Sequence, residues 1–286
     1  MMKTQKIVNS NDEPQPFLKQ LSLVDWLYAI ALMAAAAFAF SKYSQFMDIY
    51  ETTFLFGAGI TFSLLGWFWK SMRYLVPSVA VISLFSISLY QGDLERANQA
   101  FLLKYLIGSQ TAIMWMNVLF VLSALTYWFA LFKRSAFTAK VATTLVWSAV
   151  LMGFVGLMVR WYESYLMGAD IGHIPISNLY EVFVLFCLIT ALFYLYYEAR
   201  YRSMVLGAFV LWVVAAAVGF ILWYTASREA HQIQPLVPAL QSWWMKIHVP
   251  ANFIGYGTFA LAAMVGIAYL VKSKGVLEDR LPPLEV

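Results

Sequence analysis

Eight apolar runs follow one another along the chain, and no other feature constrains its fold as much. Each is about long enough to cross a hydrocarbon core of about 30 Å. Backbone groups in lipid must be satisfied within the structure, and the runs lack the alternation of barrel strands, which leaves helices. The sequence therefore predicts an all-α, polytopic membrane helix bundle with about eight transmembrane helices. The predicted spans lie near 23–40, 53–69, 74–90, 111–132, 141–159, 180–197, 204–224 and 251–271.

The composition agrees with a membrane protein and excludes several other classes. Hydrophobic residues make up 62% of the chain and charged residues 12%, whereas soluble domains carry about 25% charged residues. The net charge of +4 comes from short connections, so membrane lipid is an expected partner and nucleic acid is not. The single cysteine, Cys187, excludes an intrachain disulfide and dithiol exchange, and its apolar surroundings indicate a small buried hydrophobe.

The distribution of lysine and arginine predicts an orientation. The N-terminal tail and the even-numbered connections hold 13 of the 19 basic residues, and the other connections hold 6. The positive-inside rule then places both termini in the cytoplasm. The long connections near 91–110, 160–179 and 225–250 face outward.

All three histidines, His173, His231 and His248, lie in or at the edge of these outward connections. A membrane cytochrome of the b type needs histidines inside its helices, so this pattern argues against that class. The predicted spans also hold few ionisable residues, which argues against an ion-coupled transporter with a binding site at mid-membrane.

Residues 236–256 form the stretch with the most distinctive chemistry. Leu236, Leu240, Trp243 and Ile247 recur at helical spacing, which predicts an amphipathic helix over 238–247, lying on the membrane surface. Such a helix would hold an imidazole beside aromatic planes, an arrangement that suits a flat, apolar, metal-bearing ligand. The alternative is an interfacial aromatic belt with a boundary histidine, which is common in membrane proteins.

The loop before the sixth span predicts a defined helix start. Pro175 favours an extended approach, and Asn178 followed by Glu181 has the spacing of a capping box. A plain helix cap is one interpretation. The other is that this helix N-terminus binds a carboxylate-bearing ligand, with His173 as a ligand or hydrogen-bond donor.

Arg160 ends the fifth predicted span on the same side of the membrane. An arginine there usually extends to water. Pairing with Glu163 or with a propionate of a bound ligand is the alternative.

Four stretches together carry a resemblance to a known family. They are RWYES at 160–164, GHIPISNLYE at 172–181, LVPALQSWWMKIHVP at 236–250 and NFIGYGTFAL at 252–261. They closely resemble cytochrome c assembly proteins of the CcsA/ResC type, often labelled CcsB in bacteria. The resemblance is strong over 141–271 and extends in general layout to the N-terminal spans.

The resemblance implies haem handling in system II cytochrome c maturation, as part of a cytochrome c haem lyase (synthase) complex. Haem b would be cargo, delivered with a ResB-type membrane partner at the outer face of a bacterial cytoplasmic (inner) membrane. The recipient would be an apocytochrome c with a Cys-x-x-Cys-His site. His248 matches the family's external histidine, an axial ligand of the haem iron. The other expected cofactor-binding residues are Trp243, Trp244, Asn178, Tyr180, Glu181 and His173; no catalytic residue is assigned.

The sequence also departs from the family pattern. The family's tryptophan-rich WWD segment and later histidines would follow the span containing Tyr256, and they are not found before Val286. We therefore expect at most half an axial ligand pair from this chain. The predicted division is a cytoplasmic tail (1–22), a four-span scaffold (23–132), the N-terminal part of the assembly domain (141–271) and a cytoplasmic connector (272–286). The alternatives are a structural membrane subunit without its own haem site and a multi-span small-solute permease.

Overall fold

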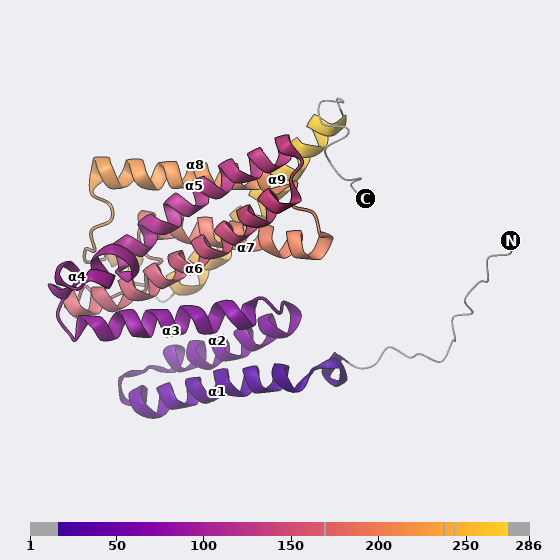
Figure 1. The fold of residues 1–286 in the computed structure, drawn as a ribbon. Coiled ribbons are helices and arrows are strands. Elements are labelled where there is room, and N and C mark those ends of the chain that lie inside the picture. The colour runs from indigo at the N-terminus through magenta and orange to yellow at the C-terminus, as the bar shows by residue number, and fades with distance from the viewer. Residues whose placement is uncertain (1–16, 169, 237, 243, 274–286) are drawn as a thin grey trace. The chain divides into compact units, whose positions relative to one another are not determined.

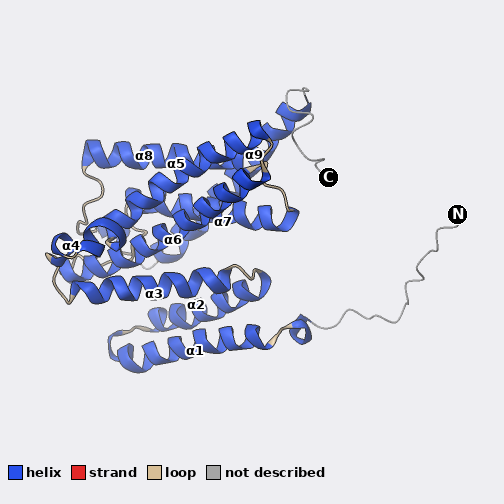
Figure 2. Ribbon diagram, in the orientation of Figure 1, coloured by secondary structure: helices blue, strands red, loops and turns tan. Residues whose placement is uncertain are grey.

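The computed structural model describes residues 17–168, 170–236, 238–242 and 244–273, and every regular element in these residues is helical (Figure 2). Eight of the helices in this part are long and apolar enough to cross a membrane, so the predicted helix bundle with about eight spans is confirmed. The cytoplasmic location of the termini stays a prediction. The domain division predicted from the sequence also stays a prediction, and residues 1–16 and 274–286 of its end segments lie outside the described residues.

The helices keep the order of the predicted spans. The long ones are α1 (Leu23–Tyr43), α2 (Ile49–Phe68), α3 (Met72–Tyr90), α5 (Ser109–Lys133), α6 (Ala136–Met167), α7 (Leu179–Tyr201), α8 (Gly207–Arg228) and α9 (Met245–Ser273). The short ones are η1 (Phe17–Gln20), η2 (Ser44–Phe46), α4 (Arg96–Gln99), the π-helical turn η3 (Leu103–Ile107) and η4 (Pro238–Leu240).

Helices α6 and α9 extend furthest beyond their predicted spans, and one predicted helix is not formed by the described residues. Helix α6 continues to Met167 and α9 begins at Met245. The surface helix expected over 238–247 is wrong, because only η4 and the first turn of α9 are helical there. Side chains interrupt it: the Gln241 amide donates to the Leu236 carbonyl, and Ser242 Oγ accepts from the Trp244 N–H. Such local side-chain bonds compete with helical backbone bonds.

The chain divides into two compact units, Met1–Pro77 and Ser78–Val286. The first unit holds α1, α2 and the first turns of α3. Its main polar contact is a buried ion pair between Asp25 on α1 and Arg73 on α3. Trp67 also donates to the backbone carbonyl of Asp25, and Arg73 to that of Gly66. These bonds satisfy polar groups that would be costly inside lipid.

The second unit is built around the pair α5 and α6. Helix α8 packs on α5 and α7, and α9 packs mainly on α7. The α5–α6 contact is close because Gly153 and Gly156 of α6 face Met116 and Ile113 of α5 at distances that leave no room for a Cβ atom. Small residues permit this backbone approach, and dispersion then stabilises helix pairs in lipid.

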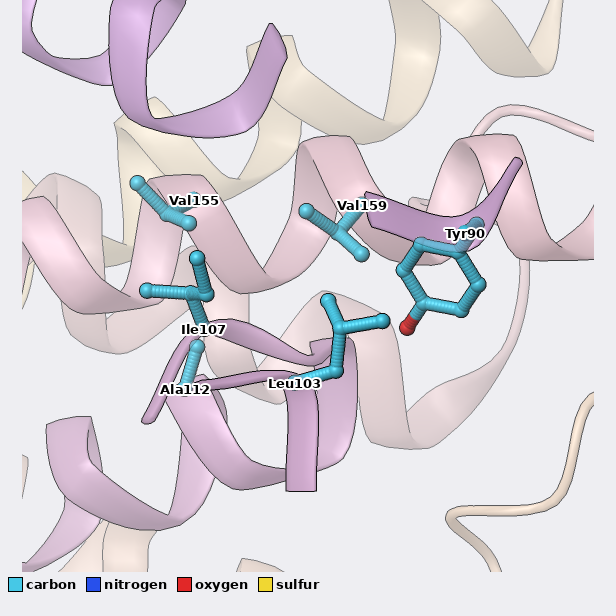
Figure 3. Close-up of a cluster of buried hydrophobic side chains, with 6 residues drawn as sticks. All are labelled: Tyr90, Leu103, Ile107, Ala112, Val155 and Val159. Atoms are coloured by element: carbon cyan, nitrogen blue, oxygen red, sulfur yellow. The ribbon is translucent and has the colours of Figure 1, made fainter. Parts of the chain in front are cut away.

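The connection between α3 and α5 folds back onto this pair. Its η3 turn inserts Leu103 and Ile107 among Tyr90, Ala112, Val155 and Val159, all buried (Figure 3). The hydroxyl of Ser86 donates to the Ile107 carbonyl at 2.7 Å and ties the turn to α3. This cluster fixes one end of the second unit, where the chemistry described below is found.

Candidate functional site

Three long connections of the second unit meet at one end of the bundle (Figure 1). Glu163 of α6 accepts hydrogen bonds from the hydroxyls of Tyr90 and Ser109, at the end of α3 and the start of α5. Arg160, one turn earlier on α6, donates to the backbone carbonyl of His231 at 2.6 Å, in the connection after α8. We call this the pocket end. The segments that the sequence assigned to one side of the membrane are therefore brought together.

A cavity of about 390 Å³ opens at the pocket end. Its volume is within the range of small-molecule sites. One wall comes from the loop between α6 and α7, and the other from the stretch that leads into α9. Apolar and polar side chains both line it: Tyr165, Ile171, Ile174, Leu236, Leu240 and Met245, with Asp170, His173, Ser177, Gln241, Ser242 and Lys246. This mixture suits an amphipathic ligand.

Behind the cavity, the start of α7 is the capping box predicted from the sequence. Asn178 Oδ1 accepts from the Glu181 N–H at 2.8 Å. In return, Glu181 Oε2 accepts from the backbone N–H groups of Ser177 at 3.0 Å and Asn178 at 3.4 Å. The prediction of a capped helix start is therefore confirmed.

Glu181 also has a second role, which the sequence did not reveal. Its other oxygen, Oε1, accepts from Arg160 Nε at 2.8 Å, and both side chains are almost fully buried. The remaining guanidinium nitrogens donate to the carbonyls of His231 and Gln232, and the guanidinium lies 5.3 Å from the centre of the Tyr180 ring. The expectation that Arg160 extends to water is wrong, because it is only 2% exposed, and its carboxylate partner is Glu181 and not the alternative, Glu163. Arg160 is committed to Glu181 because a buried charge needs a close counter-charge.

His173 lies between this ion pair and the cavity. Its Nδ1 is 2.7 Å from the Ile171 carbonyl oxygen, so Nδ1 carries a proton, and its Nε2 is 3.5 Å from Glu181 Oε1. Burial acts to lower the pKa of His173, but hydrogen bonding to Glu181 and Ile171 outweighs it, so the pKa lies above its ordinary value. A protonated His173 places one more positive charge on the cavity wall.

Tyr180 is also buried behind the cavity. Its hydroxyl donates to the Gln110 side-chain oxygen on α5 at 3.0 Å. Of the predicted site residues that the structure describes, His173 lines the cavity, while Asn178, Tyr180 and Glu181 hold the helix start that positions it. Their predicted contact with a cofactor stays a prediction.

His248 is exposed in the first turn of α9, directly after the cavity-lining Met245 and Lys246. Its N–H donates to the Trp244 carbonyl at 2.8 Å, so the two residues are one helical turn apart. The Trp244 side chain is 61% exposed, and Trp243 lies outside the described residues. The Asn252 amide nitrogen is 2.8 Å from His248 Nε2. Because an amide nitrogen only donates, Nε2 accepts and bears the lone pair.

Among the residues that the structure describes, no three His, Cys, Asp or Glu side chains are grouped to hold a metal ion. Cys187 is fully buried, as its apolar context predicted. Apart from His173, the sequence analysis did not assign the cavity residues, Lys246 included, to a site, because they come from two connections whose proximity depends on helix packing. Lys246 could have been found from its position two residues before His248, the proposed ligand.

The comparisons with known proteins concern the same part of the chain. A family model described as "Cytochrome C assembly protein" matches residues 176–285. The chain resembles the cytochrome c assembly proteins over this segment. The resemblance predicted from the four motifs is therefore confirmed, and the match includes the start of α7 and all of α9.

Three curated relatives carry the name "Cytochrome c biogenesis protein CcsA". The protein of Chlorella vulgaris is 38% identical over 120 residues, which are 41% of this chain and 35% of the relative. That of Trieres chinensis is 34% identical over 152 residues, 52% of this chain and 46% of the relative. That of Gloeobacter violaceus is 34% identical over 155 residues, which are 54% of this chain and 43% of the relative. The chain thus matches less than half the length of each relative. No solved structure matches it.

Proposed function

We propose that this chain handles haem at the outer face of the membrane and presents it for covalent attachment to an apocytochrome c. In this role it is a component of a system II haem lyase complex. One observation carries the proposal: the segment that resembles cytochrome c assembly proteins builds much of the pocket end, where a 390 Å³ cavity lies beside the exposed His248.

His248 is the proposed axial ligand of the haem iron. The contact with Asn252 favours the tautomer whose Nε2 lone pair is free to bind a metal. Iron would replace the Asn252 amide as the partner of this nitrogen. Trp244, and Trp243 as expected from the sequence, supply aromatic surface next to it. One histidine would supply one of the two axial ligands of the haem iron.

The cavity wall supplies charges that suit the carboxylates of haem b. Lys246 and His173 both line it, and His173 carries a second positive charge when protonated. Arg160 is not proposed for this task, because it is buried and each of its three nitrogens already donates to an acceptor inside the protein. Its role is to hold Glu181, and through Glu181 the position of His173.

The partners follow from the same proposal. A ResB-type membrane protein would deliver haem, and an apocytochrome c with a Cys-x-x-Cys-His site would receive it. The two thioether bonds would form on the apocytochrome thiols, so this chain would contribute binding and orientation. The pocket end would face the outer side of a bacterial cytoplasmic (inner) membrane.

A reduced-minus-oxidised absorbance spectrum of the detergent-purified chain tests the proposal. We expect haem bands in the wild type, their loss in His248→Ala, and their return when imidazole is added to the variant. His231→Ala is the matched control, since this histidine lies in the same connection and faces Arg160 through its backbone; its bands should equal those of the wild type.

Equal haem bands in wild type and His248→Ala would refute His248 as the ligand. Folded wild type and variant without haem would instead favour the structural-subunit alternative.

A further inference from the structure

A second buried carboxylate lies at the other end of α7. Glu198 is 17 residues beyond Glu181 on the same helix, which corresponds to about 25 Å at 1.5 Å per residue. It is only 8% exposed. In the described part of the chain, no lysine, arginine or histidine lies within ion-pair distance of Glu198; the described ion pairs involve other acidic residues. A buried carboxylate without a counter-charge needs another means of stabilisation.

Three hydroxyl groups surround this carboxylate. Thr143 of α6 donates to Oε1 at 2.8 Å, and Tyr127 of α5 donates to Oε2 at 2.7 Å. Tyr194, one turn earlier on α7, also donates to Oε2. The start of α8 closes the group, because Gly207 lies against the Tyr127 ring and the Tyr194 hydroxyl. Side chains of α5, α6 and α7 therefore meet at one carboxylate, and α8 packs on the two tyrosines that hold it.

The same atoms can accommodate a proton on Glu198 without losing a hydrogen bond. A proton on Oε1 would be donated to Thr143 Oγ1. The Thr143 hydroxyl would then donate to the Ala139 carbonyl, 3.1 Å away, and the Tyr194 hydroxyl to the Met204 carbonyl, 3.4 Å away. Tyr127 would continue to donate to Oε2. Hydroxyl groups can both donate and accept, which is why rotation suffices.

The position of Glu198 along α7 also favours proton binding. Glu198 lies in the last turn of α7, where the carbonyl end of the helix dipole disfavours negative charge. Its described hydrogen-bond partners are two phenols and one threonine hydroxyl, and none of the described ion pairs includes it. At the pocket end, by contrast, Arg160 holds Glu181 in its charged form.

We propose that Glu198, with Tyr127, Thr143 and Tyr194, is a reversible proton-binding site within the helix bundle. Ionisable residues inside transmembrane segments are rare, and those without a structural counter-charge commonly take part in proton movement. The site is independent of the haem proposal, since it lies on the opposite end of α7 and shares no residue with the cavity. Proton binding there changes which hydroxyls hold α5, α6 and α7 together.

Infrared spectroscopy of the full purified chain, recorded between mildly acidic and mildly alkaline pH, tests this site. We expect a carbonyl band of a protonated carboxylic acid that grows as the pH falls and is missing in Glu198→Gln. Exposed Glu229 provides the matched control, because Glu229→Gln should leave the band in place. A Glu198-dependent band that is absent at every pH, or unchanged over the whole range, would overturn the proposal.

A second variant keeps the test decisive if Glu198→Gln does not fold. Tyr194→Phe retains the carboxyl group and removes one donor to its ionised form. Losing a hydrogen bond to the charged form favours the neutral form, so the protonated-acid band should persist to higher pH in this variant than in wild type. An unchanged pH dependence of the band in folded Tyr194→Phe would also overturn the proposal.

Discussion

The two ends of α7 each hold a buried carboxylate, and they stabilise it in different ways. At the pocket end, Glu181 is held by a buried arginine, by two backbone N–H groups and by His173. At the other end, the described partners of Glu198 are all hydroxyl groups. A cation fixes the charge of a carboxylate, whereas hydroxyls serve both its charged and its neutral form. The pocket end is therefore built to keep a fixed arrangement, and the Glu198 end to exchange a proton.

The largest expected effect concerns the buried ion pair. Arg160→Leu leaves Glu181 buried without its cation, which should lower the free energy of unfolding by about 3–5 kcal/mol. Tyr127→Phe removes one of three neutral donors to Glu198 and should cost about 1 kcal/mol. Thermal unfolding in detergent measures both. Equal losses of unfolding free energy in the two variants would contradict the difference between the two ends of α7.

The tight packing around the Glu198 end gives the next effect. An added Cβ at Gly207 would lie 2.5 Å from the Tyr194 hydroxyl and 2.6 Å from the Tyr127 ring. Gly207→Ala should therefore destabilise the chain by about 1–3 kcal/mol. Gly219→Ala on the same helix meets no atom within 4 Å and is the control. If both variants melt at the same temperature, this end is less closely packed than described.

The helix cap at the pocket end contributes less. Asn178→Ala removes the side-chain acceptor of the Glu181 N–H and should cost about 1 kcal/mol, while Asn178→Ser keeps an acceptor and should cost less. Unfolding curves of the two variants, compared with wild type, measure the difference. A greater loss in the serine variant would contradict the capping role.

The smallest effect is a dependence of stability on pH. The pKa of His173 is raised in the folded state, so its contribution is complete below the unfolded pKa of about 6.5 and disappears as the pH rises through the folded value. Melting temperatures across this window should fall more steeply with pH in wild type than in His173→Asn. Parallel curves for the two proteins would contradict a protonated His173 on the cavity wall.

The features predicted from the sequence depend on local patterns. The eight helices follow from hydrophobic length, and the cap at Asn178 and Glu181 follows from a spacing of three residues. The Arg160–Glu181 pair joins residues 21 positions apart, and the Tyr127–Glu198 bond joins residues 71 apart. No periodic signal links such residues, because helix packing alone brings them together. The surface helix over 238–247 failed for a different reason, since apolar periodicity ignores the side-chain bonds of Gln241 and Ser242.

A haem titration that compares variants from the two ends tests the central claim most directly. Haem binding to the purified chain is followed by absorbance for wild type, His248→Ala and Glu198→Gln, each checked for folding. We expect His248→Ala to weaken binding about tenfold or more, because it removes the proposed iron ligand. Glu198→Gln should bind as wild type does. Equal binding by wild type and His248→Ala, or equal weakening in both variants, would contradict a haem site at the pocket end.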